Sequence, residues 1–141
     1  MTKPNWLFWL IAVLFLLWNL AGCGAYLSEV TMDDAAYALR YGEGVAALRD
    51  AVPTWSVAGF AIAVWGGLLG SILFLLRRGL ATPVFVVSLI AAVIGFLPLF
   101  TVEGMWETMG MADKVMPLFV LIAGALEIWA SRRYRAKGVL R

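Results

Sequence analysis

The stretch Ser56–Val102, "SVAGFAIAVWGGLLGSILFLLRRGLATPVFVVSLIAAVIGFLPLFTV", holds two long apolar runs separated by a short basic turn. The hydrocarbon core of a bilayer takes roughly 20 apolar residues to cross as a helix, because in lipid every backbone polar group must be bonded within the segment. Ser56–Leu76 and Pro83–Val102 meet this length, and only residues 77–82 join them. The sequence therefore predicts an antiparallel helical hairpin within a membrane.

Two further apolar runs lie outside this hairpin, at Trp6–Leu27 and at Val115–Ala130, which is the shortest. The chain is 63% hydrophobic and 14% charged, a balance typical of membrane proteins. Together the runs predict an all-α fold, a four-transmembrane-helix bundle that forms a single membrane domain over residues 1–141.

The basic residues divide unevenly between the two sides of such a bundle. One side carries Lys3, Arg77, Arg78, Arg132, Arg133, Arg135, Lys137 and Arg141, and the other carries Arg40, Arg49 and Lys114. By the positive-inside rule, both termini are expected in the cytoplasm, with residues 131–141 as a basic cytoplasmic tail. Most acids then fall on the external side.

Aromatic residues mark the expected membrane interfaces. Trp6, Trp9, Trp55 and Trp129 are predicted interface anchors, with Tyr26 and Tyr134 at similar depth, because amphipathic rings favour the headgroup level. Trp18 and Trp65 lie deeper in their runs, so we expect them to be packing residues rather than interface anchors.

The external loop 28–54 is long enough to have structure of its own. Thr31–Asp34 is typical of a helix start, and apolar or aromatic residues recur at helical spacing from Tyr37 until Pro53. Gly42 and Gly44 interrupt this pattern. We expect two short helices or one broken helix over the outer end of the bundle, either as a simple lid or as a surface that docks a partner or gates a ligand.

Glu127 is the one ionisable residue well inside a predicted span, and such residues are functional candidates by default. It lies five residues before Arg132, roughly 7–8 Å deeper along a helix. A structural ion pair with Arg77, Arg78 or Arg132, or a solvated carboxylate, is therefore one interpretation. Proton or cation coupling is the other.

Asn19 is the second candidate polar site, because an amide within lipid needs a hydrogen-bond partner. It is expected to hold the first helix in the bundle, with ligand contact as the alternative.

Small residues recur along the second span as Gly59, Ala63, Gly66, Gly67 and Gly70. Such a stripe lets helices approach closely, and it predicts packing against the first or third span or against another chain. Gly95 and Pro98 predict a kink near the outer end of the third span.

Leu20-Ala21-Gly22-Cys23 matches the box after which a lipoprotein signal peptide is cut and its cysteine acylated. The apolar run nevertheless continues past Cys23 to a full spanning length, where processed lipoproteins usually become polar. We therefore expect a retained first helix, with Gly22 and Gly24 as close-packing positions.

Residue types limit the possible chemistry. The chain has no histidine and a single cysteine, which removes most ligands for zinc, copper, haem or iron–sulfur sites. No group of residues has a recognisable catalytic spacing. The sequence also has no long basic run of the kind that binds nucleic acid. We expect no cofactor, no metal site, no catalytic residue and no nucleic-acid partner, so the protein is predicted not to be an enzyme.

Three features of the sequence, taken together, are informative about its relationships. They are Trp18-Asn19 before Gly22, the entry Pro53-Thr54-Trp55 to the second span, and "GFAIAVWGGLLGSILFLLRR" leading into "ATPVFVVSL". They resemble a group of small four-helix inner-membrane proteins of proteobacteria that often carry the label "sugar transporter". The resemblance covers most of the chain and implies a multi-pass protein of the bacterial inner membrane. It carries over no functional residues.

Three functions remain open from the residues. The favoured one is a non-catalytic accessory or assembly subunit that packs against a larger membrane complex. The alternative is a small-solute transporter or channel, in which Glu127 and Asn19 act within a homo-oligomer. The least favoured is an enzyme of lipid or quinone chemistry. A sugar path needs many midplane hydrogen-bonding groups, and the spans offer chiefly Asn19, Ser71, Ser88 and two indoles.

Overall fold

A computed structural model describes residues 3–141, and this part of the chain is all helical, with no strand. The prediction of an all-α fold is therefore confirmed. The helices are α1 (Trp6–Thr31), α2 (Asp34–Tyr41), α3 (Glu43–Ala46), the 3₁₀ turn η1 (Arg49–Ala51), α4 (Thr54–Leu75), α5 (Ala81–Phe96), α6 (Pro98–Thr101), α7 (Met105–Thr108) and α8 (Met111–Ala136).

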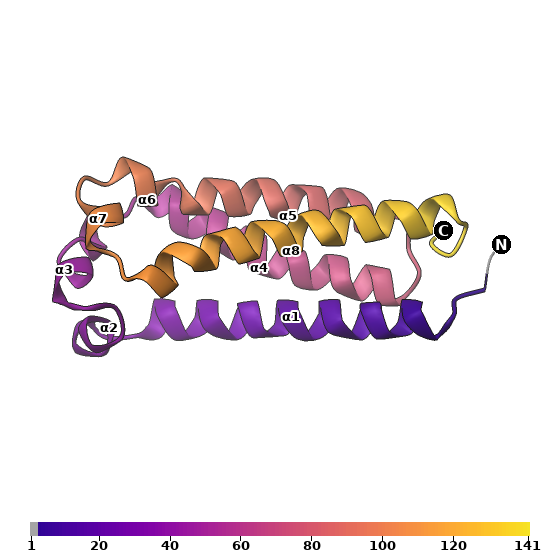
Figure 1. Ribbon diagram of the computed structural model, residues 1–141, viewed down its shortest axis with the longest axis horizontal. Helices are drawn as coiled ribbons and strands as arrows, with labels where there is room; N and C mark the ends of the chain where they lie inside the picture. The colour runs from indigo at the N-terminus through magenta and orange to yellow at the C-terminus, as the bar shows by residue number, and fades with distance from the viewer. Residues whose placement is uncertain (1–2) are drawn as a thin grey trace.

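The four long helices α1, α4, α5 and α8 lie side by side and alternate in direction (Figure 1). Three segments are long and apolar enough to cross a membrane: α1, α4, and the stretch Ala81–Thr101 that comprises α5 and α6. The length and composition of these three segments are those of membrane-spanning helices. The predicted fourth span lies within α8, and its passage through the bilayer stays a prediction.

The two ends of the bundle differ in structure and charge. The start of α1, the end of α8 and the turn between α4 and α5 lie at one end of the bundle (Figure 1). We call it the basic end, because Arg77 and Arg78 lie in that turn and Arg132 and Arg133 in the last part of α8. The short helices α2, α3 and α7 cover the opposite end, which we call the acidic end.

Glycines let α4 and α5 approach closely. A Cβ added at Gly59 would lie 3.1 Å from the carbonyl oxygen of Ala91 and 3.2 Å from the backbone nitrogen of Gly95. Further along, Ala63 packs with Ala91 in a buried cluster, and a Cβ at Gly70 would meet the Phe85 ring at 2.7 Å. The small-residue stripe therefore faces the third apolar segment.

An aromatic core fills the basic end. Phe8 of α1 stacks on Phe74 of α4 with ring centroids 4.9 Å apart, and Tyr134 of α8 meets Phe8 edge-on at 5.1 Å. Tyr134 is buried in this cluster, so its expected place at the lipid interface is wrong. The ring instead closes the space between the first and last helices.

The segment 131–141, expected as a basic tail, completes α8 and then folds back onto the bundle. Val139 and Leu140 are buried in the aromatic core. The backbone N–H of Gly79 donates to the Arg141 carbonyl at 2.6 Å, and the Arg141 N–H donates to the Arg77 carbonyl at 2.9 Å. These bonds tie the last residues to the α4–α5 turn.

The loop 28–54 contains α2, α3 and η1, and packs with α7 into what we call the cap. Its helices separate at Gly42, where φ is +92°, a conformation that favours glycine. Tyr37, Val45 and Met105 form its buried centre. Burial in the cap, followed by the nearby Glu29 carboxylate, raises the pKa of Tyr41 to about 12.

Arg49 fastens the cap to the end of α1. Its guanidinium donates to the carbonyls of Glu29 at 3.1 Å and of Met32 at 2.9 Å, pairs with Asp34, and lies over the Tyr37 ring. A charged donor that serves several acceptors fixes the geometry of the loop beyond what its short helices provide.

The third apolar segment is interrupted where the sequence predicted a kink. Helix α5 ends at Phe96 and α6 begins at Pro98, so the break falls between Gly95 and the proline. Proline lacks an N–H and cannot continue the ladder of hydrogen bonds, which accounts for the interruption.

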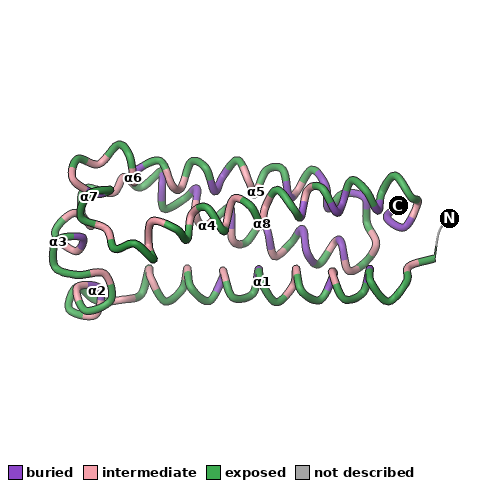
Figure 2. Tube along the Cα trace, viewed as in Figure 1, coloured by how far each residue is buried: buried purple, intermediate pink, exposed green. Residues whose placement is uncertain are grey.

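Most outward surface of the long helices is exposed and apolar (Figure 2). The predicted anchors Trp6, Trp9, Trp55 and Trp129 are all exposed, near the helix ends. Trp18 and Trp65, the expected packing residues, are 41% and 44% exposed, so they do not pack fully within this bundle. Glycines and alanines, rather than large rings, fill the contacts between its helices.

Candidate functional site: a buried polar contact between α1 and α8

The two polar residues singled out from sequence meet inside the bundle. The Asn19 Nδ2 of α1 donates to the Glu127 Oε2 of α8 at 2.7 Å. Both residues are buried, with exposed fractions of 6% and 4%. A single hydrogen bond thus joins α1 to α8, which are far apart in the sequence. Apart from this bond, α1 packs mainly against α4, and α8 packs mainly against α5.

Asn19 also bonds within its own helix. Its Nδ2 donates a second time, to the carbonyl oxygen of Phe15 at 2.8 Å. Both amide hydrogens are therefore used, one along α1 and one across to α8. This arrangement fixes the rotamer of the carboxamide and points it at the carboxyl group.

Gly67 of α4 makes room for the Asn19 side chain. A Cβ at Gly67 would collide with the Asn19 Oδ1, which lies directly against the α4 backbone. A Cβ at the neighbouring Gly66 would meet only Ser88 of α5, whereas a Cβ at Gly67 would also lie 3.4 Å from the Ser88 Oγ. Gly67 therefore borders both α1 and α5, and the stripe by itself did not distinguish it from Gly66.

Glu127 meets none of the arginines proposed as its partners. Two ion pairs, Arg40 with Asp113 and Arg49 with Asp34, lie outside the bundle and do not involve Glu127. The side chain is buried and so is not a solvated carboxylate either. Its orientation explains both corrections, because it points inward to α1 while Arg132 points away from that contact.

Other polar side chains also tie helices together. Ser88 donates to the Ala63 carbonyl at 2.6 Å, and Ser56 to the Gly95 carbonyl at 2.8 Å, both between α4 and α5. Thr82 of α5 donates to Ser131 of α8 at 3.0 Å. Sequence reasoning missed Ser56, Thr82 and Ser131, because hydroxyls near span ends are common and nothing in their spacing sets these apart.

This geometry favours a structural role for the pair. A buried carboxyl group is costly unless hydrogen-bonded, and Asn19 supplies a donor at short range. Cys23, one turn further along α1, is buried as well, and its thiol donates to the Val64 carbonyl at 3.4 Å. Among the described residues, His, Cys, Asp and Glu form no group of three or more that could hold a metal ion.

The fold and site together define an all-helical protein with three segments suited to cross a membrane, whose internal polar groups bond from helix to helix. Comparisons with protein-family models, with curated proteins and with solved structures found no match to this chain.

Proposed function

We propose that this protein is a non-catalytic accessory or assembly subunit that packs against a larger complex in a bacterial inner membrane. In this proposal α8 is the fourth span and both termini are cytoplasmic. The proposal rests on one observation above the others, the outward position of Trp18 and Trp65 in the middle of their helices.

An indole in the middle of a span is an unusual lipid-facing group. Tryptophan favours the headgroup level, where its N–H can be hydrated, and in hydrocarbon that N–H needs an acceptor. Within residues 3–141 neither the Trp18 nor the Trp65 N–H finds one, while both rings are more than two-fifths exposed. A protein partner that supplies acceptors and packing would satisfy both rings.

The internal polar groups support the same choice over transport. Asn19 and Glu127 are the best candidates for a solute path, and their short hydrogen bond holds α1 to α8. In a transporter these groups would have to exchange partners with the solute. If Asn19 and Glu127 serve only to hold α1 against α8, they keep the same hydrogen-bond partner throughout.

The test is capture of the tagged protein in mild detergent, followed by native mass spectrometry of the intact assembly. We expect a heteromeric complex, and expect Trp18→Leu or Trp65→Leu to weaken it. Trp6→Leu is the matched control, since that indole lies at a helix end and is also exposed.

Two results would count against the proposal. A chain that is always a lone monomer has no partner to assemble with. Assembly only with copies of itself, together with solute uptake in reconstituted vesicles that Glu127→Gln abolishes, would favour the transporter instead.

A further inference from the structure

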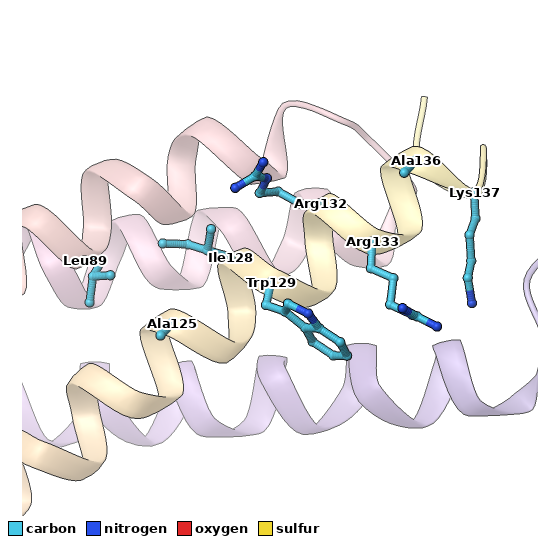
Figure 3. A pocket seen from close by; sticks show the side chains of 8 residues that line it. All are labelled: Leu89, Ala125, Ile128, Trp129, Arg132, Arg133, Ala136 and Lys137. Atoms are coloured by element: carbon cyan, nitrogen blue, oxygen red, sulfur yellow. The ribbon is translucent and has the colours of Figure 1, made fainter.

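A surface groove runs along the outer face of α8 beside α5, towards the basic end (Figure 3). Its volume is about 670 Å³. The residues that line it are Leu89, Ala125, Ile128, Trp129, Arg132, Arg133, Ala136 and Lys137. It lies on the opposite side of α8 from the contact between Glu127 and Asn19.

The lining changes character along the helix. Leu89, Ala125 and Ile128 form an apolar strip towards the middle of the bundle. Arg132 and Arg133 lie one to two turns further along, at the end of the apolar segment. No acidic residue is among the residues that line the groove.

Trp129 lies between the two zones. Its ring is 60% exposed, and the Arg133 guanidinium lies over it at 5.6 Å from the ring centroid. A guanidinium that stacks on an indole loses less freedom when it then binds an anion, because part of its motion is already restricted.

We propose that this groove binds one anionic phospholipid. Its phosphate is held by Arg132 and Arg133, and an acyl chain lies along Leu89, Ala125 and Ile128. Guanidinium groups bind phosphate with paired hydrogen bonds, and basic pockets at the end of membrane helices favour anionic headgroups.

The order of the two zones is what selects a lipid. Charge lies at the end of the apolar segment and the apolar strip lies deeper, as headgroup and chain do in a leaflet. A soluble anion would use the arginines but leave the apolar strip unfilled. The inference needs only a membrane-embedded α8 and does not depend on the proposed partner complex.

The experiment measures lipid retention by native mass spectrometry after reconstitution with equal amounts of phosphatidylglycerol and phosphatidylethanolamine. We expect one phosphatidylglycerol to be retained preferentially. The variant Arg132→Gln with Arg133→Gln should lower this preference roughly thirtyfold, because each charge near an anionic surface contributes about a fivefold factor.

The matched control removes the same charge from the same end of the protein, as Arg135→Gln with Arg141→Gln. Neither residue lines the groove, and this variant should retain the lipid as the wild type does. A second arm, Ala125→Trp, fills the apolar strip at an exposed position without any change in charge, and should also release the lipid.

The outcomes separate the alternatives. Equal retention of the two lipids would overturn the proposal, because the groove would then not select an anionic headgroup. Equal loss in the control variant would overturn it as well, because the charge of the basic end alone would then explain binding. A third arm adds inorganic phosphate at millimolar concentration. Displacement of the lipid by phosphate, with no effect of Ala125→Trp, would show a free-anion site and would overturn it too.

Discussion

The Asn19 carboxamide donates both of its amide hydrogens inside the bundle, one to the Phe15 carbonyl and one to the Glu127 carboxyl group. Interhelical hydrogen bonds within membranes stabilise by roughly 0.6 to 2 kcal/mol, since the separated helices also find partners. The loss of one partner is more damaging than that range suggests, because the other polar group is left buried and unbonded. The two residues should therefore be strongly coupled.

We predict that a double-mutant cycle with Asn19→Leu and Glu127→Leu will show non-additive losses in the free energy of unfolding, with a coupling of about 1 kcal/mol. As a single variant, Asn19→Leu should lower the free energy of unfolding more than Glu127→Leu does, because it leaves the Glu127 carboxyl group buried without a donor. Thermal unfolding in detergent, followed by circular dichroism, measures both quantities.

Glu127→Gln is the control for this cycle, because its amide oxygen can still accept from Asn19. It should unfold close to the wild-type temperature. Strictly additive losses from the two leucine variants would mean that the contact does not stabilise the bundle.

At the scale of the helices, the contact between α4 and α5 depends on backbone approaching backbone. Gly59 faces the Ala91 carbonyl and the Gly95 nitrogen, and neither atom can move without shifting a helix. Gly70, by contrast, faces a phenylalanine ring, which can rotate aside. Equal substitutions along one stripe should therefore have unequal effects.

We expect Gly59→Ala to destabilise the protein by roughly 1–3 kcal/mol, the usual result of overpacking a close contact. Gly24→Ala in α1 is the matched control, because a Cβ there meets nothing within 4 Å, so the expectation that Gly24 is a close-packing position is wrong. Chemical unfolding in detergent compares the two. Equal stability of the two variants would show that the helices can separate without loss, and the close approach would then be unimportant.

For the whole molecule, the basic and acidic ends imply one orientation in a membrane. The chain ends, the α4–α5 turn and the groove lie at the basic end, while the cap lies at the other (Figure 1). The rule that basic loops stay in the cytoplasm then places the cap outside, provided that α8 crosses the bilayer.

We predict that single-cysteine variants in a Cys23→Ser background will label accordingly. The variant Glu43→Cys, in the cap, should react with a membrane-impermeant maleimide in intact cells. Lys3→Cys and Lys137→Cys should react only after permeabilisation. Early labelling of Lys137→Cys without that of Lys3→Cys would mean that the helices cross the membrane an odd number of times.

Much of the fold could be predicted because it follows from local composition. The apolar runs, the short turn at 77–82 and the glycine at 42 each determine an element or its boundary through length or backbone freedom alone. The choice of Asn19 and Glu127 also needed no structure, since strongly polar groups are rare within such runs.

The sequence by itself thus determined an all-helical membrane protein, its long helices and its two polar candidates. Only the tertiary structure decided that these candidates bind each other, that Gly67 admits Asn19, and that Trp18 and Trp65 face outward while Tyr134 faces in. The physical reason is that these helices are apolar on all sides, so their sequence pattern does not indicate which face is buried. The rotation of each helix is set instead by close packing at glycines and by hydrogen bonds between residues distant in sequence.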